Sequence, residues 1–209
     1  MQNLLAGYQR FRANGWPEKR REFELLAENG QSPRALVVAC IDSRVDPAMI
    51  FDTAPGEMLT VRNVASLVPP YAPDASYHGT SAALEFGVRV LEVRDLIVLG
   101  HGLCGGVKTL LDREQDGGTP DQANEFVAPW MSIARPACER AMRFPPGEGR
   151  RLICEHEVIK VSLNNLMTFP WIAERVAAGD LTLHGAWFDI RIGALMILQP
   201  DGAFAPQEV

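Results

Sequence analysis

Short apolar runs are the first regular feature of the sequence, and they predict strands. Three such runs lie at 35–39, 58–62 and 95–99, each bounded by polar or turn-forming residues. Near the end of the chain, "LTLHGAWFDIRIGALMIL" predicts two further strands joined near Gly193. Two strands joined by a tight turn pair with each other, so we expect this pair at the edge of the sheet.

Between these strands the apolar residues change to helical spacing. The segment "TSAALEFGVRVLEV" carries small and apolar residues along one side, and its first residues, Thr80 or Ser81, are the expected N-cap. A second helix is predicted at 105–113, and a loop at 117–120 precedes further helical segments. Because strands alternate with helices, the sequence predicts an α/β fold whose mainly parallel central sheet is flanked by helices.

The first thirty residues differ from the rest of the chain. Their apolar residues recur at helical spacing: Leu4, Leu5, Tyr8 and Phe11. A break is expected at 15–17, and a charged helix follows it. A helix with an apolar stripe needs another surface to cover that stripe. We therefore expect residues 1–30 to form a helical arm on a single α/β domain at 31–209.

Composition and charge indicate which binding partners the protein is not expected to have. The 209 residues are 47% hydrophobic and 22% charged, as in an ordinary globular protein. The net charge is −6 and basic runs are absent from the sequence, so nucleic acid is not an expected partner. The sequence shows neither a signal peptide nor a membrane-spanning stretch, so we expect a cytoplasmic protein that does not bind membranes. In a reducing compartment its four cysteines are expected to be metal ligands, catalytic groups or buried residues.

Polar residues with metal-binding chemistry follow two of the predicted strands. Cys40, Asp42 and Arg44 follow the first strand, and they share one face if that segment stays extended. His101 and Cys104 follow the third strand. Ligand sites of parallel sheets lie at the carboxyl ends of the strands, so we expect the two segments to meet there. Two cysteines and one histidine are a ligand set of catalytic zinc, which leaves one coordination position for water.

Two other interpretations of these segments explain fewer residues. "GLCGGVKT" places glycines before a Lys-Thr pair, but Val107 separates glycine from lysine, which a phosphate-binding loop does not allow. A redox-active dithiol would need only the two cysteines, which lack the C-x-x-C spacing. It would leave His101, Asp42 and Arg44 without a role. The zinc interpretation is therefore preferred.

Four motifs carry a resemblance to a known family. "CIDSRVDP", "RNVASLVPPY", "YHGTSAALEFGV" and "GHGLCGGV", in this order and spacing, closely resemble the β-class carbonic anhydrases. The resemblance is continuous over about 31–111 and continues more weakly through "VSLNNLMTFP" and "LHGAWFDIRIGAL". It implies a zinc-binding catalytic domain at 31–209. The implied enzyme is a lyase that reversibly hydrates carbon dioxide to bicarbonate and a proton.

The resemblance assigns roles to the five residues at the strand ends. It makes Cys40, His101 and Cys104 the zinc ligands, and Asp42 and Arg44 the catalytic pair. The implied nucleophile is zinc-bound hydroxide, whose proton Asp42 would accept in a hydrogen bond so that the oxygen lone pair faces carbon dioxide. Arg44 would hold Asp42 ionised and fixed by a two-pronged, charge-assisted hydrogen bond.

The resemblance also implies a substrate pocket and a group within the family. The implied pocket residues are Gln31, Leu59, Val64, Phe86 and Gly105. Gln31 matches a substrate-binding glutamine of plant-like members, whereas Leu59 and Phe86 replace a phenylalanine and a tyrosine, which gives a drier pocket. Closed, bicarbonate-regulated members carry a tryptophan where this chain has Val37. We therefore expect the open state, in which Asp42 pairs with Arg44 and does not bind zinc.

The resemblance further implies an assembly, and it leaves alternative functions open. The basic unit of the family is a dimer whose subunits complete each other's pockets, so we expect a homodimer or a higher even oligomer. A related zinc hydrolase acting on carbonyl sulfide or carbon disulfide would suit the drier pocket. A non-catalytic, zinc-stabilised binding protein is a third candidate, but it would need neither Asp42 nor Arg44.

Overall fold

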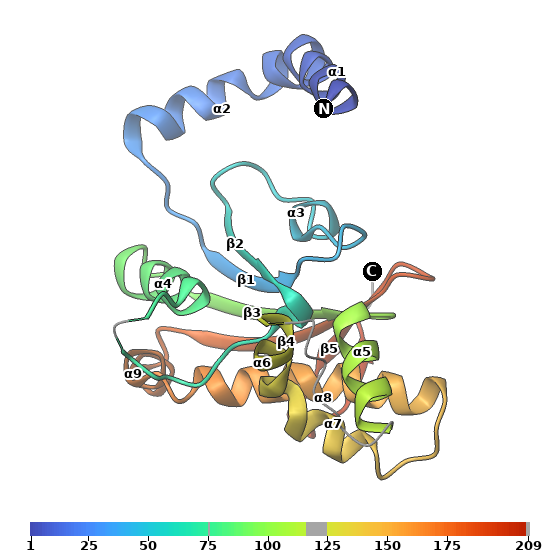
Figure 1. Cartoon of the computed structure of the whole chain (residues 1–209). Helices are drawn as coiled ribbons and strands as arrows, with labels where there is room; N and C mark the ends of the chain where they lie inside the picture. The colour runs from blue at the N-terminus through green and yellow to red at the C-terminus, as the bar shows by residue number, and fades with distance from the viewer. Residues whose placement is uncertain (75, 116–124, 208–209) are drawn as a thin grey trace.

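A six-stranded sheet forms the centre of the molecule (Figure 1). The computed structural model describes residues 1–74, 76–115 and 125–207. The strand order is β2-β1-β3-β4-β5-β6. The parallel strands are β2 (Met58–Asn63), β1 (Ala35–Cys40), β3 (Asp95–His101) and β4 (Thr182–Asp189). The antiparallel strands are β5 (Ala194–Leu198) and β6 (Phe204–Pro206). The predicted α/β fold is confirmed, and β6 lies at the edge beyond the predicted pair.

Helices connect the strands and precede the sheet. The α-helices are α1 (Gln2–Arg10), α2 (Trp16–Asn29), α3 (Pro47–Ile50), α4 (Gly79–Glu85), α5 (Gly105–Gln115), α6 (Val127–Met131), α7 (Arg135–Ala141), α8 (Glu148–Leu166) and α9 (Pro170–Ala178). Shorter π or 3-10 segments are η1 (Phe11–Gly15), η2 (Val64–Ser66), η3 (Phe86–Val90) and η4 (Ser132–Ala134). The predicted loop at 117–120 lies outside the described residues. Within the described ranges, every helix is too short or too polar to cross a membrane.

The two faces of the sheet are covered differently. Leu36 and Val38 of β1 face the side on which α4, α8 and α9 pack, and this side holds a large buried cluster. Val37 and Ala39 point to the opposite face, as alternation along a strand requires. Figure 1 shows only α3 and, farther away, the arm of α1 and α2 on that second side. An apolar cavity of about 250 Å³ lies on this face, between Val37, Ile97 and their neighbours.

The N-terminal arm is helical throughout, which corrects the predicted break at 15–17. Gly15 keeps helical angles (φ −72°, ψ −33°), and η1 widens the helix by one π-type segment instead of interrupting it. Pro17 stands at the start of α2, directly after this π-type segment. Leu4 is 75% exposed and Tyr8 is 59% exposed, so this chain leaves the apolar stripe of the arm uncovered.

The predicted N-cap of the fourth helix is also corrected. The helix begins at Gly79 with His78 as its N-cap residue, two or three residues earlier than expected. Asn63 Nδ2 donates a hydrogen bond to the Thr80 hydroxyl over 3.3 Å. Thr80 therefore connects the helix to the end of β2 instead of capping its own helix.

The imidazole of His156, on α8, is held between two aromatic rings. Its ring centroid lies 4.1 Å from that of Phe204 and 5.1 Å from that of Trp187. The buried Nε2 atom has no hydrogen-bond partner in the described part of the chain. Burial, with a smaller contribution from Lys160, lowers the pKa of His156 to about 4.

This environment predicts a pH-dependent loss of stability. As the pH falls below 6.5, His156 becomes protonated in the unfolded chain, but in the folded chain it stays neutral down to about pH 4. Protonation therefore favours the unfolded state, and stability falls as the pH falls through this window. His156→Phe keeps the ring stack and removes the titration. Between pH 6.5 and pH 4, we expect the unfolding free energy of the wild type to fall by on the order of 1–2 kcal/mol more than that of His156→Phe. This value is discounted for partial exposure of the ring. Urea unfolding at several pH values measures this, and parallel curves for both proteins would contradict it.

Candidate metal centre

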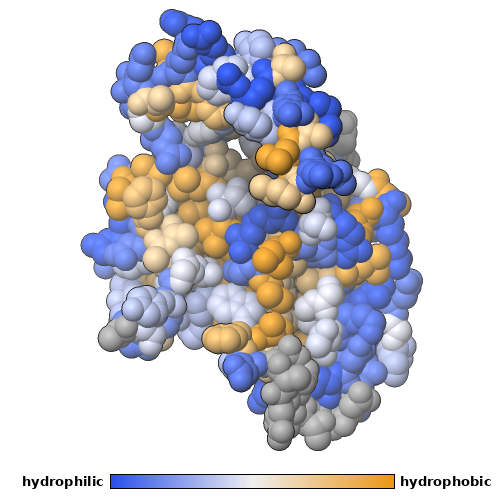
Figure 2. Space-filling model, turned by 45° about the horizontal axis from the view of Figure 1, so that its top comes forward, coloured by the Kyte–Doolittle hydropathy of each residue, from blue (hydrophilic) through white to orange (hydrophobic). Residues whose placement is uncertain are grey.

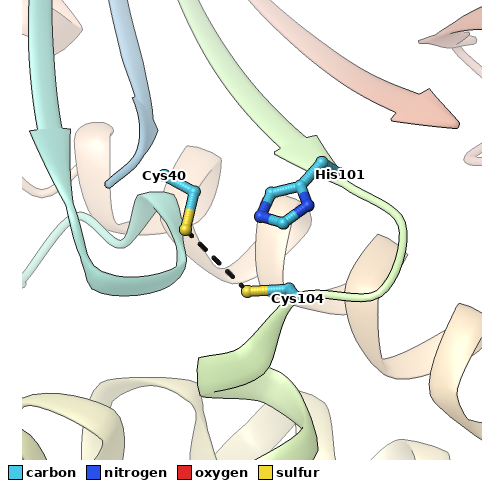
Figure 3. Close-up of side chains that lie close together, drawn as sticks. All are labelled: Cys40, His101 and Cys104. Atoms are coloured by element: carbon cyan, nitrogen blue, oxygen red, sulfur yellow. Dashed lines mark hydrogen bonds between the residues drawn. The ribbon is translucent and has the colours of Figure 1, made fainter. Parts of the chain in front are cut away.

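Three metal-ligating side chains converge where two adjacent parallel strands end. Cys40 is the last residue of β1, His101 is the last residue of β3, and Cys104 immediately precedes α5. Since β1 and β3 pair directly, their carboxyl ends lie side by side. The three buried ligand atoms lie within 4.8 Å of one another, and the two sulfurs are 4.0 Å apart (Figure 3). The predicted meeting of the two strand ends is confirmed.

His101 is oriented as a metal ligand. Its Nδ1 lies 2.8 Å from the carbonyl oxygen of Gly102, which can only accept, so Nδ1 carries the proton. The lone pair is then on Nε2, which is buried and without a hydrogen-bond partner among the described residues. A buried polar atom left unpaired is costly, and a metal ion between the sulfurs and this nitrogen satisfies it. The donor set therefore fits zinc.

The two sulfurs lie close enough to form a hydrogen bond with each other. A hydrogen bond from Cys104 lowers the pKa of Cys40 to about 4, even though burial opposes this. The same hydrogen bond, together with burial, raises the pKa of Cys104 well above its ordinary value. The backbone amides of Gly106 and Val107, at the start of α5, oppose that rise. Bound zinc would be held by Cys40 and Cys104 as thiolates, and two thiolates with one neutral imidazole would balance its charge.

Asp42 and Arg44 form the predicted bidentate pair beside the ligand group. Arg44 Nε donates to Asp42 Oδ1 over 2.9 Å, and Nη2 donates to Oδ2 over 2.7 Å. The Arg44 backbone N–H also donates to Oδ1, because the chain turns after Asp42. The segment does not stay extended, so the condition for a shared face is not met, and the pair forms within a turn. These hydrogen bonds from Arg44 hold the pKa of Asp42 well below its usual range.

The same pair is linked to the ligand loop. Asp42 Oδ2 lies 3.9 Å from His101 Nε2, next to the ligand group but outside it. Arg44 Nη2 also donates to the carbonyl oxygen of Leu103 over 3.1 Å. Leu103 has a φ of 60°, a left-handed conformation that costs a leucine energy and that this contact helps to hold.

Two residues outside the ligand group support the centre. Arg62 of β2 donates to the carbonyl oxygens of Cys40 and Asp42 over 3.0 and 2.6 Å, which fixes the turn after β1. Glu155 of α8 is 4% exposed and accepts a hydrogen bond from the backbone N–H of Cys104 over 3.3 Å. Charged residues such as Arg151 and Glu157 lie close to Glu155 in the sequence of α8, so no local signal sets it apart, and its partner Cys104 is distant in sequence.

The five predicted pocket residues separate into two groups. Val64 lines an apolar cavity of about 680 Å³, and Gly105 directly follows the ligand Cys104. In contrast, Leu59 lies among buried residues under η3, Phe86 is 48% exposed on η3, and Gln31 is exposed between α2 and β1. One chain therefore brings Val64 and Gly105 near the metal group. Within the same chain, Gln31, Leu59 and Phe86 lie outside the metal group and outside the 680 Å³ cavity.

Apolar side chains are exposed on the face that carries the arm. Figure 2 shows them both on the arm and on the body of the molecule below it. The exposed apolar residues of these regions include Leu4, Leu5, Tyr8, Ile41, Met49 and Phe86. A surface of this kind is typical of a protein–protein interface.

Comparisons with known proteins agree on one family. The carbonic anhydrase family model matches residues 35–195. Beta carbonic anhydrase 3 of Arabidopsis thaliana is 35% identical over 210 residues, which cover 99% of this chain and 80% of that protein. The chloroplastic beta carbonic anhydrase 5 of the same plant is 37% identical over 164 residues, covering 77% of this chain and 52% of that protein.

Solved structures show the same fold. The β-carbonic anhydrase CcaA superposes with a TM-score of 0.89 and 32% identity, covering 100% of this chain and 92% of that one. A tetrameric β-carbonic anhydrase of Sordaria macrospora superposes with a TM-score of 0.79 and 24% identity, covering 98% of both chains.

The ligand assignment predicts the metal content of two cysteine variants. Cys104→Ala leaves two of three ligands, so we expect most of the zinc to be lost during purification. Cys138→Ala is the matched control, because Cys138 is equally buried but lies in α7, outside the ligand group. Elemental analysis of both purified proteins measures the difference. Full zinc content in Cys104→Ala would remove this residue from the ligand set.

Proposed function

Because this chain belongs to the β-class carbonic anhydrases, we propose that it works through an open site that a second subunit completes. The enzyme is a zinc-dependent lyase that interconverts carbon dioxide and bicarbonate. One observation carries the proposal for this site. The ionised Asp42 is held on Arg44 directly beside the buried Cys40, His101 and Cys104 group.

Asp42 directs the nucleophile in this proposal. Zinc held by Cys40, His101 and Cys104 would act as a Lewis acid that lowers the pKa of water, so that hydroxide is available as the nucleophile near neutral pH. Asp42 is already ionised, because Arg44 holds its pKa low, so it acts as a hydrogen-bond acceptor and not as a reservoir for the proton. Asp42 accepts a hydrogen bond from the O–H of the attacking group, which turns the oxygen lone pair toward carbon dioxide.

The walls around this position suit a small apolar substrate. Val64 lines the 680 Å³ cavity together with Ile41 and Trp130. Trp130 Nε1 donates to the Val64 carbonyl over 2.9 Å, which removes a polar group from the wall. The next residue, Ala65, contacts the small void that His101 and Cys104 also line. Carbon dioxide, which has no net dipole, loses little hydration on entering such a site.

We propose a homodimer, or a higher even oligomer, in which the partner supplies Gln31, Leu59 and Phe86. Three features of this chain support it: the distance of these residues from the metal group, the apolar cavity on the uncovered sheet face, and the uncovered stripe of the arm. The Sordaria macrospora relative is tetrameric. A cytoplasmic location and a single catalytic domain at 31–209 stay predictions from the sequence.

The activity is tested by stopped-flow measurement of carbon dioxide hydration on the purified, zinc-loaded protein. We expect saturable hydration that a chelator removes and added zinc restores. Carbonyl sulfide and carbon disulfide are measured as competing substrates, because Leu59 and Phe86 give a drier pocket than the plant-like members have. Faster turnover of either sulfur compound would favour the related hydrolase. Zinc binding without any turnover would favour a binding protein.

Gln31 is predicted to bind substrate across the subunit interface. Gln31→Ala removes one substrate hydrogen bond, so we expect kcat/KM to fall roughly ten-fold, equivalent to about 1–2 kcal/mol. Zinc content and circular dichroism should not change, because Gln31 is exposed and distant from the metal group. Unchanged kinetics would make Gln31 only a residue of the connection between α2 and β1.

A mixed dimer separates action across the interface from action within one chain. One subunit carries Gln31→Ala and the other carries Cys104→Ala, with two affinity tags to isolate the mixed species. If Gln31 acts on the partner, the only zinc-loaded site receives an intact Gln31, and kcat/KM per zinc returns to the wild-type value. If Gln31 acts within its own chain, the ten-fold loss persists.

The open site predicts a simple pH dependence. Arg44 keeps Asp42 ionised throughout the working range, so kcat/KM should rise with pH through one ionisation, that of the attacking water, at about 7 or above. Bicarbonate should inhibit only as the product. Initial rates across this range, with and without bicarbonate, measure both effects. A steep, cooperative loss of activity below neutral pH would place the protein in the closed group.

A further inference from the structure

Glu155 is a buried acid that the reaction described above does not use. It lies on α8, the long helix that packs under the sheet, and its residue is 4% exposed. A buried carboxylate is costly unless its oxygens are well paired. Its place in the fold is therefore informative, since it stands directly behind the loop that carries the metal ligands.

Both carboxylate oxygens of Glu155 accept a hydrogen bond from a fixed donor. The backbone N–H of Cys104 donates to Oε1 over 3.3 Å, and the indole Nε1 of Trp187 donates to Oε2 over 3.3 Å. Arg151 Nε lies 3.8 Å from Oε1 and offsets the negative charge. Glu155 also lines the small void beside His101 and Cys104. The carboxylate thus contacts the ligand loop from the side opposite the Asp42–Arg44 pair.

We propose that Glu155 is a positioning residue of the zinc centre, which fixes the backbone of Cys104 so that its sulfur faces Cys40 and His101. Arg44 holds the preceding carbonyl, that of Leu103, from the other side. Two successive residues of the ligand loop are then held by hydrogen bonds: Arg44 donates to the Leu103 carbonyl, and Glu155 accepts from the Cys104 N–H. This inference rests on the proposed assignment of Cys104 as a zinc ligand.

The two donors explain why the residue is a glutamate. Cys104 N and Trp187 Nε1 both donate, so both side-chain oxygens must accept. A glutamine has one accepting oxygen, and its amide N–H₂ would face one of the two donors. Trp187 cannot easily move away, because its ring packs against the loop: a Cβ added at Gly102 would lie 3.1 Å from Trp187 Cζ2. The isosteric Glu155→Gln is therefore expected to disturb the loop.

The proposal is tested by zinc affinity, measured through competition with a chromophoric chelator. We expect Glu155→Ala to bind zinc roughly 10–100-fold more weakly than the wild type, and Glu155→Gln to be weakened as well. Glu157→Gln is the matched control. Glu157 lies on the same helix and pairs with Arg140 and Lys160, away from the ligand loop, so zinc affinity should not change.

A second readout separates positioning from general stability. In the cobalt-substituted protein, the thiolate-to-cobalt charge-transfer absorption reports the placement of the two sulfurs. We expect this absorption to shift or weaken in both Glu155 variants but not in Glu157→Gln, with circular dichroism unchanged. Wild-type zinc affinity and an unchanged cobalt spectrum in Glu155→Ala would overturn the proposal.

A double-mutant cycle tests the two-donor argument without depending on the alanine variant. Trp187→Phe removes the indole donor, so the glutamine amide of Glu155→Gln can turn its N–H₂ toward the phenylalanine and its oxygen toward Cys104. We expect Glu155→Gln to weaken zinc binding less in the Trp187→Phe background than in the wild type. Equal losses in both backgrounds would contradict the argument. Carbon dioxide hydration by the wild type, measured in parallel, shows whether the proposed function itself holds.

Discussion

The hydrogen bonds of Arg44 are the contacts on which the rest of the site depends. Its guanidinium binds both oxygens of Asp42 and also the carbonyl of Leu103, so one side chain joins the loop after β1 to the loop after β3. Cys40 directly precedes the first of these loops, and His101 and Cys104 frame the second. Arginine suits this task because its planar, always charged group offers several donors in a fixed arrangement. The pair that we propose to direct the nucleophile therefore also links the two loops beside the metal ligands.

The sheet supplies the rigid base for this link. The parallel pairing of β1 with β3 aligns the two strand ends, and α8 packs closely enough below them to bring Glu155 against Cys104. The close approach leaves little room for a side chain at Gly100: a Cβ there would lie 2.7 Å from Ile159 Cδ1 of α8, so Ile159 would have to shift. Gly100 of β3 therefore lets α8 pack close to the sheet, and this packing places Glu155 within hydrogen-bond distance of the Cys104 N–H.

The strands and the metal ligands could be predicted from the sequence because their signals are local. Each strand is a short apolar run, and each ligand follows such a run at a position where parallel strands place ligand sites. The turn at Ser43, the bond between Asn63 and Thr80, and the roles of Arg62 and Glu155 depend on partners brought together by folding. Gln31, Leu59 and Phe86 illustrate a further limit, because the pocket that we propose to be shared between subunits would not be assembled in one chain.

In the proposed open site, Arg44 keeps Asp42 away from the metal. A crystal structure of the zinc-loaded protein, determined both above and below neutral pH, would show where the Asp42 carboxylate lies. We expect it to stay on Arg44 at both pH values, Arg44 to keep its bond to the Leu103 carbonyl, and Cys40, His101 and Cys104 to be the protein ligands. Asp42 bound to zinc, with Arg44 released from it at either pH, would rule out the open site.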